Sequence, residues 1–469
     1  MRVAGSDSST QSVKVVVPEG ATGEVVRHAS RPHPPGTTCP PDAWWEALLG
    51  AIDELGGLDD VAALSVGGQQ HGLVILDEAG QPLRDAMLWN DTSSAQAASD
   101  LTDELGAETW AEAVGLVAVA SFTATKLRWV ADNEPDIARK IAAICLPHDF
   151  LTWKILGTGR LEDLVTDRSD ASGTMYFDPV SNTYRRDLVA HALRRTEADI
   201  AHIVLPRVLE PDEAGGRAQG LGLPDVVVGP GAGDNAAAGL GMGVDPGEVW
   251  VSLGTSGVVT GISEEPWRDT SGLIAGFADA TGSYLPLQAT LNGAPVLDAF
   301  ARFLGVDHEG LSDLALAAEP GAGGLTLLPL LAGERTPNLP DATGSLHGIT
   351  ATNLTRENMA RAAVEGLLCL MGACINRLDT RMDVSRIHLT GGGSRSRAVR
   401  EIAPAVLGRD VLLPQEGEHV AWGAARQAHW TLTGHLPQWS IATVETLRAE
   451  PTLQVQERWD ALMAQVAQP

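Results

Sequence analysis

Short runs of apolar, β-branched residues alternate along the chain with segments of helical periodicity. Val3 to Val17 and Val249 to Val259 each have the pattern of two strands joined by a tight turn of Ser, Thr and Gly. After each hairpin the pattern changes to alternating strands and helices, which is typical of α/β domains. The two segments therefore predict the opening hairpins of two related halves.

Three further elements are predicted in each half. In the first half these are a helix over Asp42 to Leu55, a buried strand over Val61 to Val66, and a hairpin over Gly72 to Arg84 that turns at Glu78-Ala79-Gly80. In the second half they are a long amphipathic helix over Thr355 to Leu378, a strand over Arg386 to Leu389, and a helix over Ser396 to Leu407.

The length of the chain favours two domains. A chain of 469 residues exceeds what one hydrophobic core usually supports. The sequence changes from a Gly/Ala-rich helix to the second hairpin through Asp245-Pro246-Gly247, so we expect a boundary near residue 243. This division gives an N-terminal domain over residues 1–242 and a C-terminal domain over residues 243–469.

Composition and charge narrow the class of protein. With 44% hydrophobic and 20% charged residues, the chain is expected to fold into a globular protein. The formal net charge of −27 repels polyanions, and the sequence has no Lys/Arg-rich stripe. These features argue against nucleic-acid binding, and most of the acidity is expected to be a solvated surface.

The cysteines and the apolar segments predict a cytoplasmic protein without a membrane span. Cys39, Cys145, Cys369 and Cys374 show no CxxC pairing and are expected to be reduced thiols. No stretch reaches the roughly 18 to 20 apolar residues that a membrane span needs, and the N-terminus leads directly into a strand pattern instead of a signal peptide.

One carboxylate stands in a glycine-rich turn near the middle of the chain. Asp234 follows the apolar strand at Val226 to Val228 and the segment Gly229-Pro230-Gly231-Ala232-Gly233, and it precedes a helix of small residues. This position makes Asp234 the leading candidate for a catalytic base, with a helix cap as the alternative role.

Glycine-rich turns provide candidate phosphate sites. Gly254-Thr255-Ser256-Gly257 joins two strands, and Gly391-Gly392-Gly393 joins a strand to a helix, so both can present backbone N–H groups to phosphate. A Walker-type P-loop is excluded because no lysine follows a glycine. The run Gly231 to Ala236 fits a dinucleotide fingerprint, but its acidic partner should end the next strand about 20 positions on, and Glu248 instead precedes the strand Val249 to Leu253. Together the turns indicate phosphoryl transfer.

At this point the chain resembles the FGGY family of carbohydrate kinases. The resemblance covers nearly the whole length and rests on motifs in the family's order: the N-terminal Gly5-Ser6-Asp7 hairpin, Gly68-Gln69-Gln70-His71-Gly72, Leu88-Trp89-Asn90-Asp91, Thr166-Asp167-Arg168-Ser169-Asp170, Gly231-Ala232-Gly233-Asp234-Asn235, Ser252-Leu253-Gly254-Thr255-Ser256-Gly257, Gly333-Glu334-Arg335-Thr336-Pro337 and the Gly391 segment.

The resemblance implies a fold and a reaction. It implies an α/β protein of two ribonuclease-H-like domains, of the type found in actin, hexokinase and Hsp70, flanking a central cleft. It also implies ATP, Mg²⁺ and a ketopentose, with D-xylulose phosphorylated at its terminal hydroxyl to D-xylulose 5-phosphate. A homodimer is a further expectation from the family.

The resemblance also implies roles for individual residues. Asp234 would take the proton from the sugar hydroxyl, and Asp7 would hold Mg²⁺ directly or through water. The phosphates and the adenosine side of the nucleotide would lie against Thr10, Gln11, Gly254, Thr255, Ser256, Gly392 and Gly393. The sugar would contact Gln70, His71, Asn90, Asp91, Asp234 and Asn235. His71 could instead be a structural histidine bonded to backbone, and Asn90-Asp91 could form a simple Asx turn.

Two positions depart from the family pattern. Ser9 stands where the family usually has the turn glycine, and Ser93 stands where an arginine is common. The alternatives are therefore a sibling kinase for another ketose or polyol, such as ribulose, gluconate or glycerol, and a non-catalytic sugar or nucleotide sensor. Gln70 and His71 argue against the first alternative, and the intact Asp7 and Asp234 argue against the second.

Overall fold

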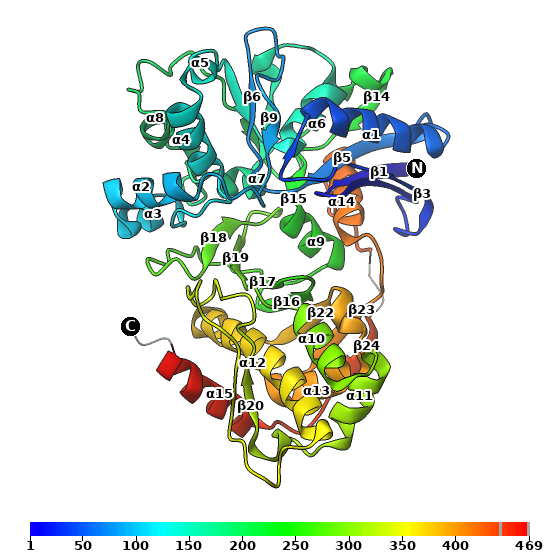
Figure 1. Ribbon diagram of the computed structural model, residues 1–469. Helices are drawn as coiled ribbons and strands as arrows, with labels where there is room; N and C mark the ends of the chain where they lie inside the picture. Colours follow the sequence, from blue (N-terminus) through cyan, green and yellow to red (C-terminus); the bar gives the residue numbers. More distant parts are fainter. Residues whose placement is uncertain (440–442, 467–469) are drawn as a thin grey trace. The chain divides into compact units, whose positions relative to one another are not determined.

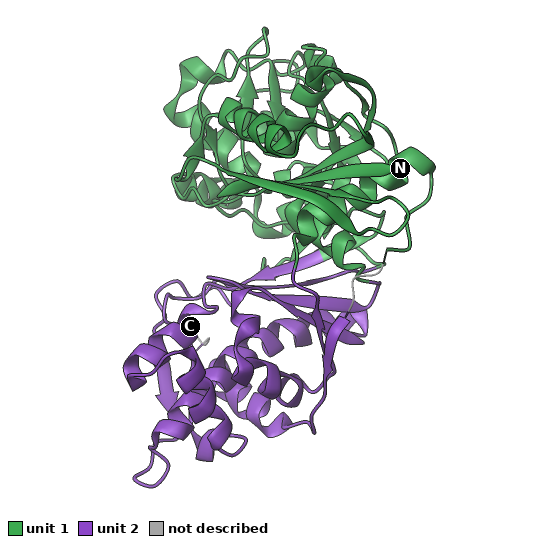
Figure 2. Cartoon of the chain, turned by 90° about the vertical axis from the view of Figure 1, so that its right-hand side faces the viewer, with its two compact units in different colours: residues 1–244, 264–285, 417–441 green, residues 245–263, 286–416, 442–469 purple. Residues whose placement is uncertain are grey.

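The protein consists of two compact α/β units (Figure 2). The computed structural model describes residues 1–439 and 443–466. Within them, unit 1 comprises residues 1–244, 264–285 and 417–439, and unit 2 comprises residues 245–263, 286–416 and 443–466. The sequence predicts one boundary near residue 243. The chain first leaves unit 1 after Val244, and two later segments return to it.

Unit 1 is built around a mixed sheet in the order β13-β14-β5-β1-β2-β3, with the short β15 also paired to β5 (Figure 1). Its strands are β1 (Arg2–Ser8), β2 (Ser12–Pro18), β3 (Val25–Pro32), β4 (Thr38–Cys39), β5 (Val61–Gly68), β6 (Val74–Leu76), β7 (Ala86–Met87), β8 (Ala143–Cys145), β9 (Val165–Asp167), β10 (Phe177–Asp178), β11 (Thr183–Tyr184), β12 (Arg207–Leu209), β13 (Gly216–Ala218), β14 (Leu223–Val228), β15 (Ala232–Gly233) and β18 (Ala275–Ala278). Its helices are α1 (Pro41–Glu54), α2 (Ala95–Leu105), α3 (Ala107–Val114), α4 (Thr123–Asn133), α5 (Pro135–Ala138), α6 (Pro147–Leu156), α7 (Arg168–Ala171), α8 (Arg186–Ala192), α9 (Asp234–Met242) and α14 (His419–Thr433).

Both faces of this sheet are covered by helices, because its strands alternate apolar residues toward each face. On one face Val13 and Val15 pack with Trp44 of α1 and Phe150 of α6. On the other face Val3 packs with alanines of α14, which in turn packs against α9. A helix from the end of the chain therefore completes the core of the first unit.

The contact between β1 and α14 requires a glycine. A Cβ atom added at Gly5 would lie 2.0 Å from the carbonyl oxygen of Ala421 and 2.3 Å from the backbone nitrogen of Ala425. On the facing surfaces of α14 and α9, a Cβ at Gly423 would lie 1.9 Å from the carbonyl oxygen of Ala237. Glycine at these two positions lets three backbones approach one another closely.

Unit 2 has a sheet of the same design. Its strands are β16 (Glu248–Leu253), β17 (Gly257–Gly261), β19 (Tyr284–Ala289), β20 (Thr326–Leu328), β21 (Ser345–His347), β22 (Arg386–Thr390), β23 (Val411–Pro414) and β24 (Thr443–Leu447), and its helices are α10 (Pro295–Leu304), α11 (His308–Ala317), α12 (Arg356–Met382), α13 (Arg397–Leu407) and α15 (Leu453–Val466). The strand order β19-β17-β16-β22-β23 matches β3-β2-β1-β5-β14 of unit 1, with antiparallel pairs followed by parallel ones. The prediction of two related halves is confirmed.

Helix α12 forms the centre of unit 2. It contacts α10, α11, α13 and α15, and Leu367, Leu370 and Met371 are fully buried. In the part of the chain that the structure describes, it is the one helix long and apolar enough to cross a membrane, and 83% of its apolar window is buried. Such burial is expected of a core helix.

Most of the predicted elements are present. The bounds of helix α1, strand β5, strand β22 and helix α13 lie within two residues of those predicted, and helix α12 ends four residues later than predicted. The hairpin predicted over Gly72 to Arg84 is present around its turn. Strand β6 is its first arm, and on the return the carbonyl oxygen of Gln81 accepts from Asp77 N–H at 2.9 Å, Leu83 N–H donates to the carbonyl oxygen of Ile75 at 2.9 Å, and Leu76 bridges Pro82. The return arm is not a regular strand, and the strand partner of β6 is β8.

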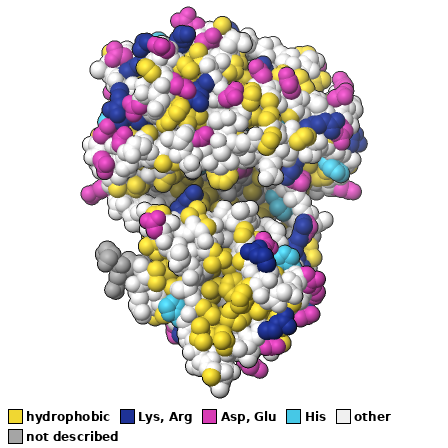
Figure 3. Space-filling model, viewed as in Figure 1, with side chains coloured by type: hydrophobic (Ala, Val, Ile, Leu, Met, Phe, Trp, Pro, Cys, Tyr) yellow, Lys and Arg dark blue, Asp and Glu magenta, His cyan; other side chains and the backbone are white. Residues whose placement is uncertain are grey.

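Surface charge is mixed on the face shown in Figure 3. Acidic and basic side chains are interspersed over the visible part of unit 1, and hydrophobic side chains gather on the visible part of unit 2. On this face of unit 1 the acidic side chains are not gathered into one field.

Substituting Gly5→Ala should destabilise unit 1, because the added methyl group overlaps backbone atoms of α14 that cannot move independently. We expect a loss on the order of 3 kcal/mol, measured as a lower urea midpoint. Gly417→Ala is the matched control, since a Cβ there meets nothing within 4 Å. Equal midpoints for the two variants would contradict this packing.

Candidate functional site

Strand register brings two aspartates to the same end of the unit 1 sheet. Strand β5 lies between β1 and β15, and Asp7 and Ala232 both pair with Gly67. In the next row, Ser8 and Gly233 both pair with Gly68. Asp234 follows directly as the first residue of α9. Two segments more than 200 residues apart in sequence therefore place their carboxylates around one strand end.

The glycines of β5 let three helices approach this strand end. A Cβ at Gly67 would lie 2.8 Å from Val420 Cγ1 of α14 and 3.3 Å from Ala237 Cβ of α9. A Cβ at Gly68 would lie 2.7 Å from His148 Cβ of α6. The contacts with Val420 and His148 are closer than real Cβ atoms tolerate, so glycine at both positions permits the arrangement.

Asp7 is buried, with 3% of its surface exposed. It accepts a hydrogen bond from the Ser9 hydroxyl, and Lys14 Nζ lies 3.8 Å from its Oδ2 atom. Lys14 also pairs with Glu418 at 2.7 Å. Burial raises the pKa of Asp7 to about 6, although the Ser9 hydrogen bond and Lys14 act in the opposite direction.

Asp234 is partly exposed at the start of α9. Its Oδ1 atom accepts hydrogen bonds from the backbone N–H of Asn235 at 2.7 Å and from Asn235 Nδ2 at 2.9 Å. Burial of the carboxyl group, and then the negative charge of Asp7, raise the pKa of Asp234 to about 7. The N-cap residue of α9 is Gly233, so capping does not account for Asp234.

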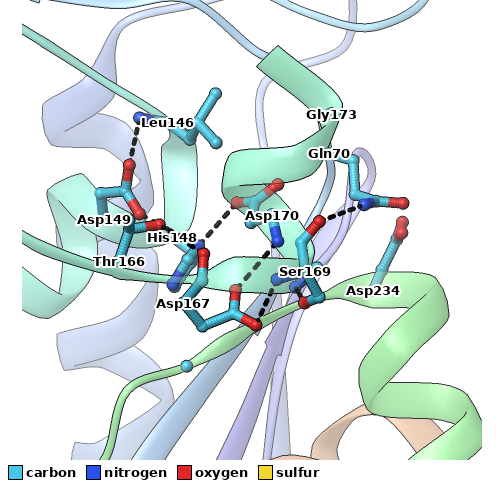
Figure 4. A network of polar contacts seen from close by, with 12 residues as sticks. Gln70, Leu146, His148, Asp149, Thr166, Asp167, Ser169, Asp170, Gly173 and Asp234 are labelled. Carbon is cyan, nitrogen blue, oxygen red and sulfur yellow. Dashed lines mark hydrogen bonds and ion pairs between the residues drawn. The ribbon is translucent and has the colours of Figure 1, made fainter. Parts of the chain in front are cut away.

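A chain of amides joins Asp234 to the strand end of β5. Asn235 Nδ2 also donates to Gln70 Oε1 at 3.2 Å, and Gln70 Nε2 donates to the carbonyl oxygen of Ser169 at 3.5 Å. Ser169 Oγ accepts from the backbone N–H of Gly233 at 3.0 Å. Figure 4 shows Gln70 and Ser169 beside Asp234 at the N-terminus of α9.

His71 is held in an unusual backbone conformation, with φ at 70°. Its Nδ1 atom lies 3.0 Å from the carbonyl oxygen of Gly173, and its ring packs edge-on against Phe122 and tilted against Phe277. A carbonyl can only accept, so Nδ1 is the nitrogen that carries a proton in this contact. The backbone bond anticipated for a structural histidine is therefore present.

Asn90 and Asp91 lie in the loop after β7. Asp91 is buried, and it accepts from Thr37 Oγ1 at 3.1 Å, from the Ser93 backbone N–H at 2.8 Å and from the Ser93 hydroxyl. The bond to Ser93 N–H is an Asx turn. Asn90 Oδ1 is buried and has no hydrogen-bond partner among the described residues.

The first hairpin turn exposes Thr10 and Gln11 to different degrees. Thr10 is half-buried; its hydroxyl accepts from Trp89 Nε1 at 2.8 Å and donates to Gln69 Oε1 at 3.3 Å. The Gln11 side chain is exposed. Trp89 and Gln69 were not among the predicted site residues, although they lie within the motifs Leu88 to Asp91 and Gly68 to Gly72.

Unit 2 brings its two candidate phosphate turns together. Strands β16 and β22 are parallel and in register, with Ser252 opposite Thr390, so the turns that follow them share one edge. A Cβ at Gly391 would lie 2.7 Å from the carbonyl oxygen of Leu253. The Gly254-Thr255-Ser256 turn and the Gly392-Gly393 segment are therefore neighbours, and Thr255 and Gly392 are exposed.

Two groups of residues thus emerge, one in each unit. Unit 1 combines a carboxylate of raised pKa, a second carboxylate and several neutral amides. Such a set can accept a proton from a hydroxyl and bind a polar, uncharged ligand. Unit 2 offers backbone N–H groups and hydroxyls at adjacent glycine-rich turns, which suit phosphate.

The sequence matches a known family over most of its length. Residues 3–241 match the N-terminal domain of the FGGY family of carbohydrate kinases, and residues 249–432 match its C-terminal domain.

Individual relatives agree with this match. Over 476 residues, the chain is 43% identical to xylulose kinase from Streptomyces coelicolor, covering 99% of this chain and 95% of the relative. The crystal structure of xylulose kinase from Bifidobacterium adolescentis superimposes with a TM-score of 0.96 at 48% identity, covering 99% of both chains. Glycerol kinase from Plasmodium falciparum, at 18% identity and a TM-score of 0.86, shares the fold and covers 100% of this chain and 98% of that one. The chain belongs to the FGGY family of carbohydrate kinases.

Proposed function

We propose that this protein transfers the γ-phosphoryl group of ATP to the terminal hydroxyl of D-xylulose and forms D-xylulose 5-phosphate. The substrate is that named for the relatives at 43% and 48% identity. The observation that carries the mechanism is the pair of carboxylates at the end of β1 and the start of α9.

Asp234 is proposed as the general base. A base works best when its pKa lies near the working pH, and burial together with Asp7 brings the pKa of Asp234 to about 7. The two hydrogen bonds from Asn235 hold Oδ1, which orients the carboxylate at a fixed angle. As the sugar hydroxyl attacks phosphorus, its proton passes to Asp234 while the bond from the γ-phosphorus to the bridging oxygen of ADP breaks.

Asp7 is proposed to hold Mg²⁺, directly or through water. The residue fits this role, because Mg²⁺ prefers hard oxygen ligands and Asp7 offers a buried carboxylate at the end of β1. When bound with ATP, the ion neutralises phosphate charge during transfer.

The nucleotide is proposed to contact the turns of both hairpins. Thr10 and Gln11 in unit 1, and Gly254, Thr255 and Ser256 in unit 2, offer hydroxyls or backbone N–H groups to the phosphates. Gly392 and Gly393 would pass close to the α-phosphate and adenosine side. The absence of any atom within 4 Å of a Cβ built at Gly392 supports this proposal, since that surface is open.

The sugar is proposed to contact Gln70, His71, Asn90, Asp234 and Asn235. Amide and neutral imidazole groups pair with hydroxyls without charge. The unpaired Oδ1 of Asn90 is an acceptor available to a sugar hydroxyl. The carboxylate of Asp91 is already engaged by Thr37 and Ser93, so we assign it to holding the Asn90 loop in place.

The compartment and the assembly stay predictions. Cys39, Cys145, Cys369 and Cys374 are free, buried thiols, which supports a reducing compartment such as the cytoplasm. A homodimer is expected from the family alone, and sizing of the purified protein by light scattering would test it.

Asp234→Asn should abolish sugar phosphorylation while leaving ATP binding intact, because an amide cannot accept the proton. We expect kcat to fall by roughly 10²- to 10⁴-fold in a coupled ADP-release assay over D-xylulose, D-ribulose, gluconate and glycerol. Asp225→Asn, at an exposed carboxylate of β14, is the control and should match the unmodified protein. Near-normal turnover by Asp234→Asn would exclude Asp234 as the base. If the unmodified protein preferred another sugar, D-xylulose would be excluded as the substrate.

The same variant should stabilise the empty protein at high pH. A raised folded-state pKa means that ionised Asp234 opposes folding above about pH 7, and this penalty fades as pH falls from 7 toward the ordinary value of 3.8. From urea unfolding, we expect the free energy of unfolding of Asp234→Asn to exceed that of the unmodified protein by on the order of 1–2 kcal/mol at pH 8. At pH 4 the two free energies should be almost equal. A pH-independent difference would contradict the raised pKa.

Gly392→Ala should weaken nucleotide binding selectively. The added methyl group meets no protein atom, so the fold should be unchanged, but it would occupy space proposed for the nucleotide. We expect KM for ATP to rise about tenfold with an unchanged KM for D-xylulose, equivalent to about 1.4 kcal/mol of lost binding. An unchanged KM for ATP would remove Gly392 from the nucleotide site.

A further inference from the structure

A buried histidine lies behind the turn that carries Asp234. His148, in the first turn of α6, is 0% exposed. Its Nδ1 atom lies 2.6 Å from Asp170 Oδ2 and 3.3 Å from Asp149 Oδ1, and its Nε2 atom lies 3.3 Å from the carbonyl oxygen of Pro230 (Figure 4). Both ring nitrogens therefore face acceptors.

This arrangement is satisfied by a doubly protonated ring. A neutral imidazole has one N–H, so it would direct a lone pair at either a carboxylate or a carbonyl in the core. Burial alone lowers the pKa of His148, but Asp149, Asp170 and then Asp167 raise it to about 10. The two facing acceptors and this raised pKa both favour an imidazolium, which would offset part of a buried cluster of carboxylates.

One contact from His148 reaches the Asp234 turn through the backbone. Gly231 has φ at 87°, and a Cβ there would lie 2.3 Å from His148 Cδ2 and 2.4 Å from its Nε2 atom. The imidazole thus lies directly against the turn. Gln427 holds the other side of Gly231, accepting from its N–H at 3.0 Å and donating to its carbonyl oxygen at 2.8 Å.

A second path runs through α7. Asp170, the partner of His148, lies in this one-turn helix, whose N-terminus is capped by Asp167 through Ser169 N–H at 2.7 Å and Asp170 N–H at 2.9 Å. The hydroxyl of Ser169 accepts from Gly233 N–H at 3.0 Å. Gly233 immediately precedes Asp234, so fixing α7 also fixes the residue before the carboxylate.

We propose that His148 is a positioning residue for phosphoryl transfer: its buried imidazolium clamps the Pro230–Gly231 turn on one side and Asp170 of α7 on the other, and so fixes the place of Asp234. The proposal rests on the proposed role of Asp234 as base. Because misplacement of a reacting group by about 1 Å can cost roughly 10²-fold in rate, loosening this clamp should act on kcat.

The same cluster could instead bind a metal ion, because ligand atoms of His148, Asp149 and Asp170 lie within 4.8 Å of one another. A metal at Nδ1 would require its lone pair, whereas the 2.6 Å separation from Asp170 Oδ2 is that of a charge-assisted hydrogen bond. The geometry therefore favours a proton shared between His148 and Asp170. The metal content of the purified protein distinguishes the two alternatives.

The kinetic test compares three variants of the full chain. His148→Gln removes the charge, His148→Lys retains a charge beside Asp149 and Asp170, and Ser169→Ala cuts only the link to Gly233. We expect kcat with D-xylulose to fall about 10- to 100-fold for His148→Gln and about tenfold for Ser169→Ala. The KM for ATP should be unchanged in both variants. His148→Lys should have a kcat between those of His148→Gln and the unmodified protein. His429→Gln, at a half-buried histidine of α14, is the control.

A spectroscopic test does not depend on turnover. In ¹⁵N-histidine-labelled protein, the His148 ring, assigned by its loss in His148→Gln or His148→Lys, should stay doubly protonated at pH 8.5. A neutral ring at that pH, stoichiometric zinc in the purified protein, or loss of kcat only in proportion to loss of folded protein would each overturn the proposal. Turnover retained by Asp234→Asn would instead overturn the role of Asp234 as base. The measured protonation state of His148 would still hold, so the two failures can be told apart.

Discussion

The site in unit 1 depends on the absence of side chains at the end of β5. Gly67 and Gly68 pair with β1 on one side and β15 on the other, and the space their side chains would fill is taken by Val420, Ala237 and His148. Helices from three distant parts of the sequence can therefore close on one strand end. Larger residues would push these helices apart and separate Asp7, Asp234 and the histidine behind them.

Packing at this point has an electrostatic consequence. Burial raises the pKa of Asp7 despite its contacts with Ser9 and Lys14, and the charge of Asp7 adds to the burial that raises the pKa of Asp234. The fold thus holds a carboxylate that can be protonated and deprotonated near neutral pH, at a cost in stability. In its proposed imidazolium form, His148 adds positive charge within the same region, placed against the backbone turn instead of against the base itself.

Local patterns in the sequence predicted a large part of the architecture. The two hairpins, α1, α12 and α13 were found because apolar periodicity and Gly or Pro at their ends are local signals. The family resemblance, carried by short motifs, is confirmed by the domain matches. The pairing of β6 with β8, some 70 residues away, was not predicted, because such distant pairing leaves no local mark in the sequence.

Other features could not be anticipated because they depend on tertiary contacts. Nothing in the residues 417–439 indicates that α14 completes the core of unit 1. His148 was missed because a histidine inside an apolar helix carries no signal without its partners, although its place beside Pro147 and Asp149 at a helix start was visible. The engagement of Asp91 by Ser93 was weighed as an Asx turn, and that bond is present. The site roles themselves stay proposals.

Titration of the Asp234 carboxyl group tests the central claim most directly. In protein with ¹³C-labelled aspartate and no ligand, the signal that disappears in Asp234→Asn should titrate near pH 7, and it should move to lower pH in Asp7→Asn, where the neighbouring negative charge is gone. A carboxyl that titrates near 3.8 and ignores Asp7→Asn would contradict the account.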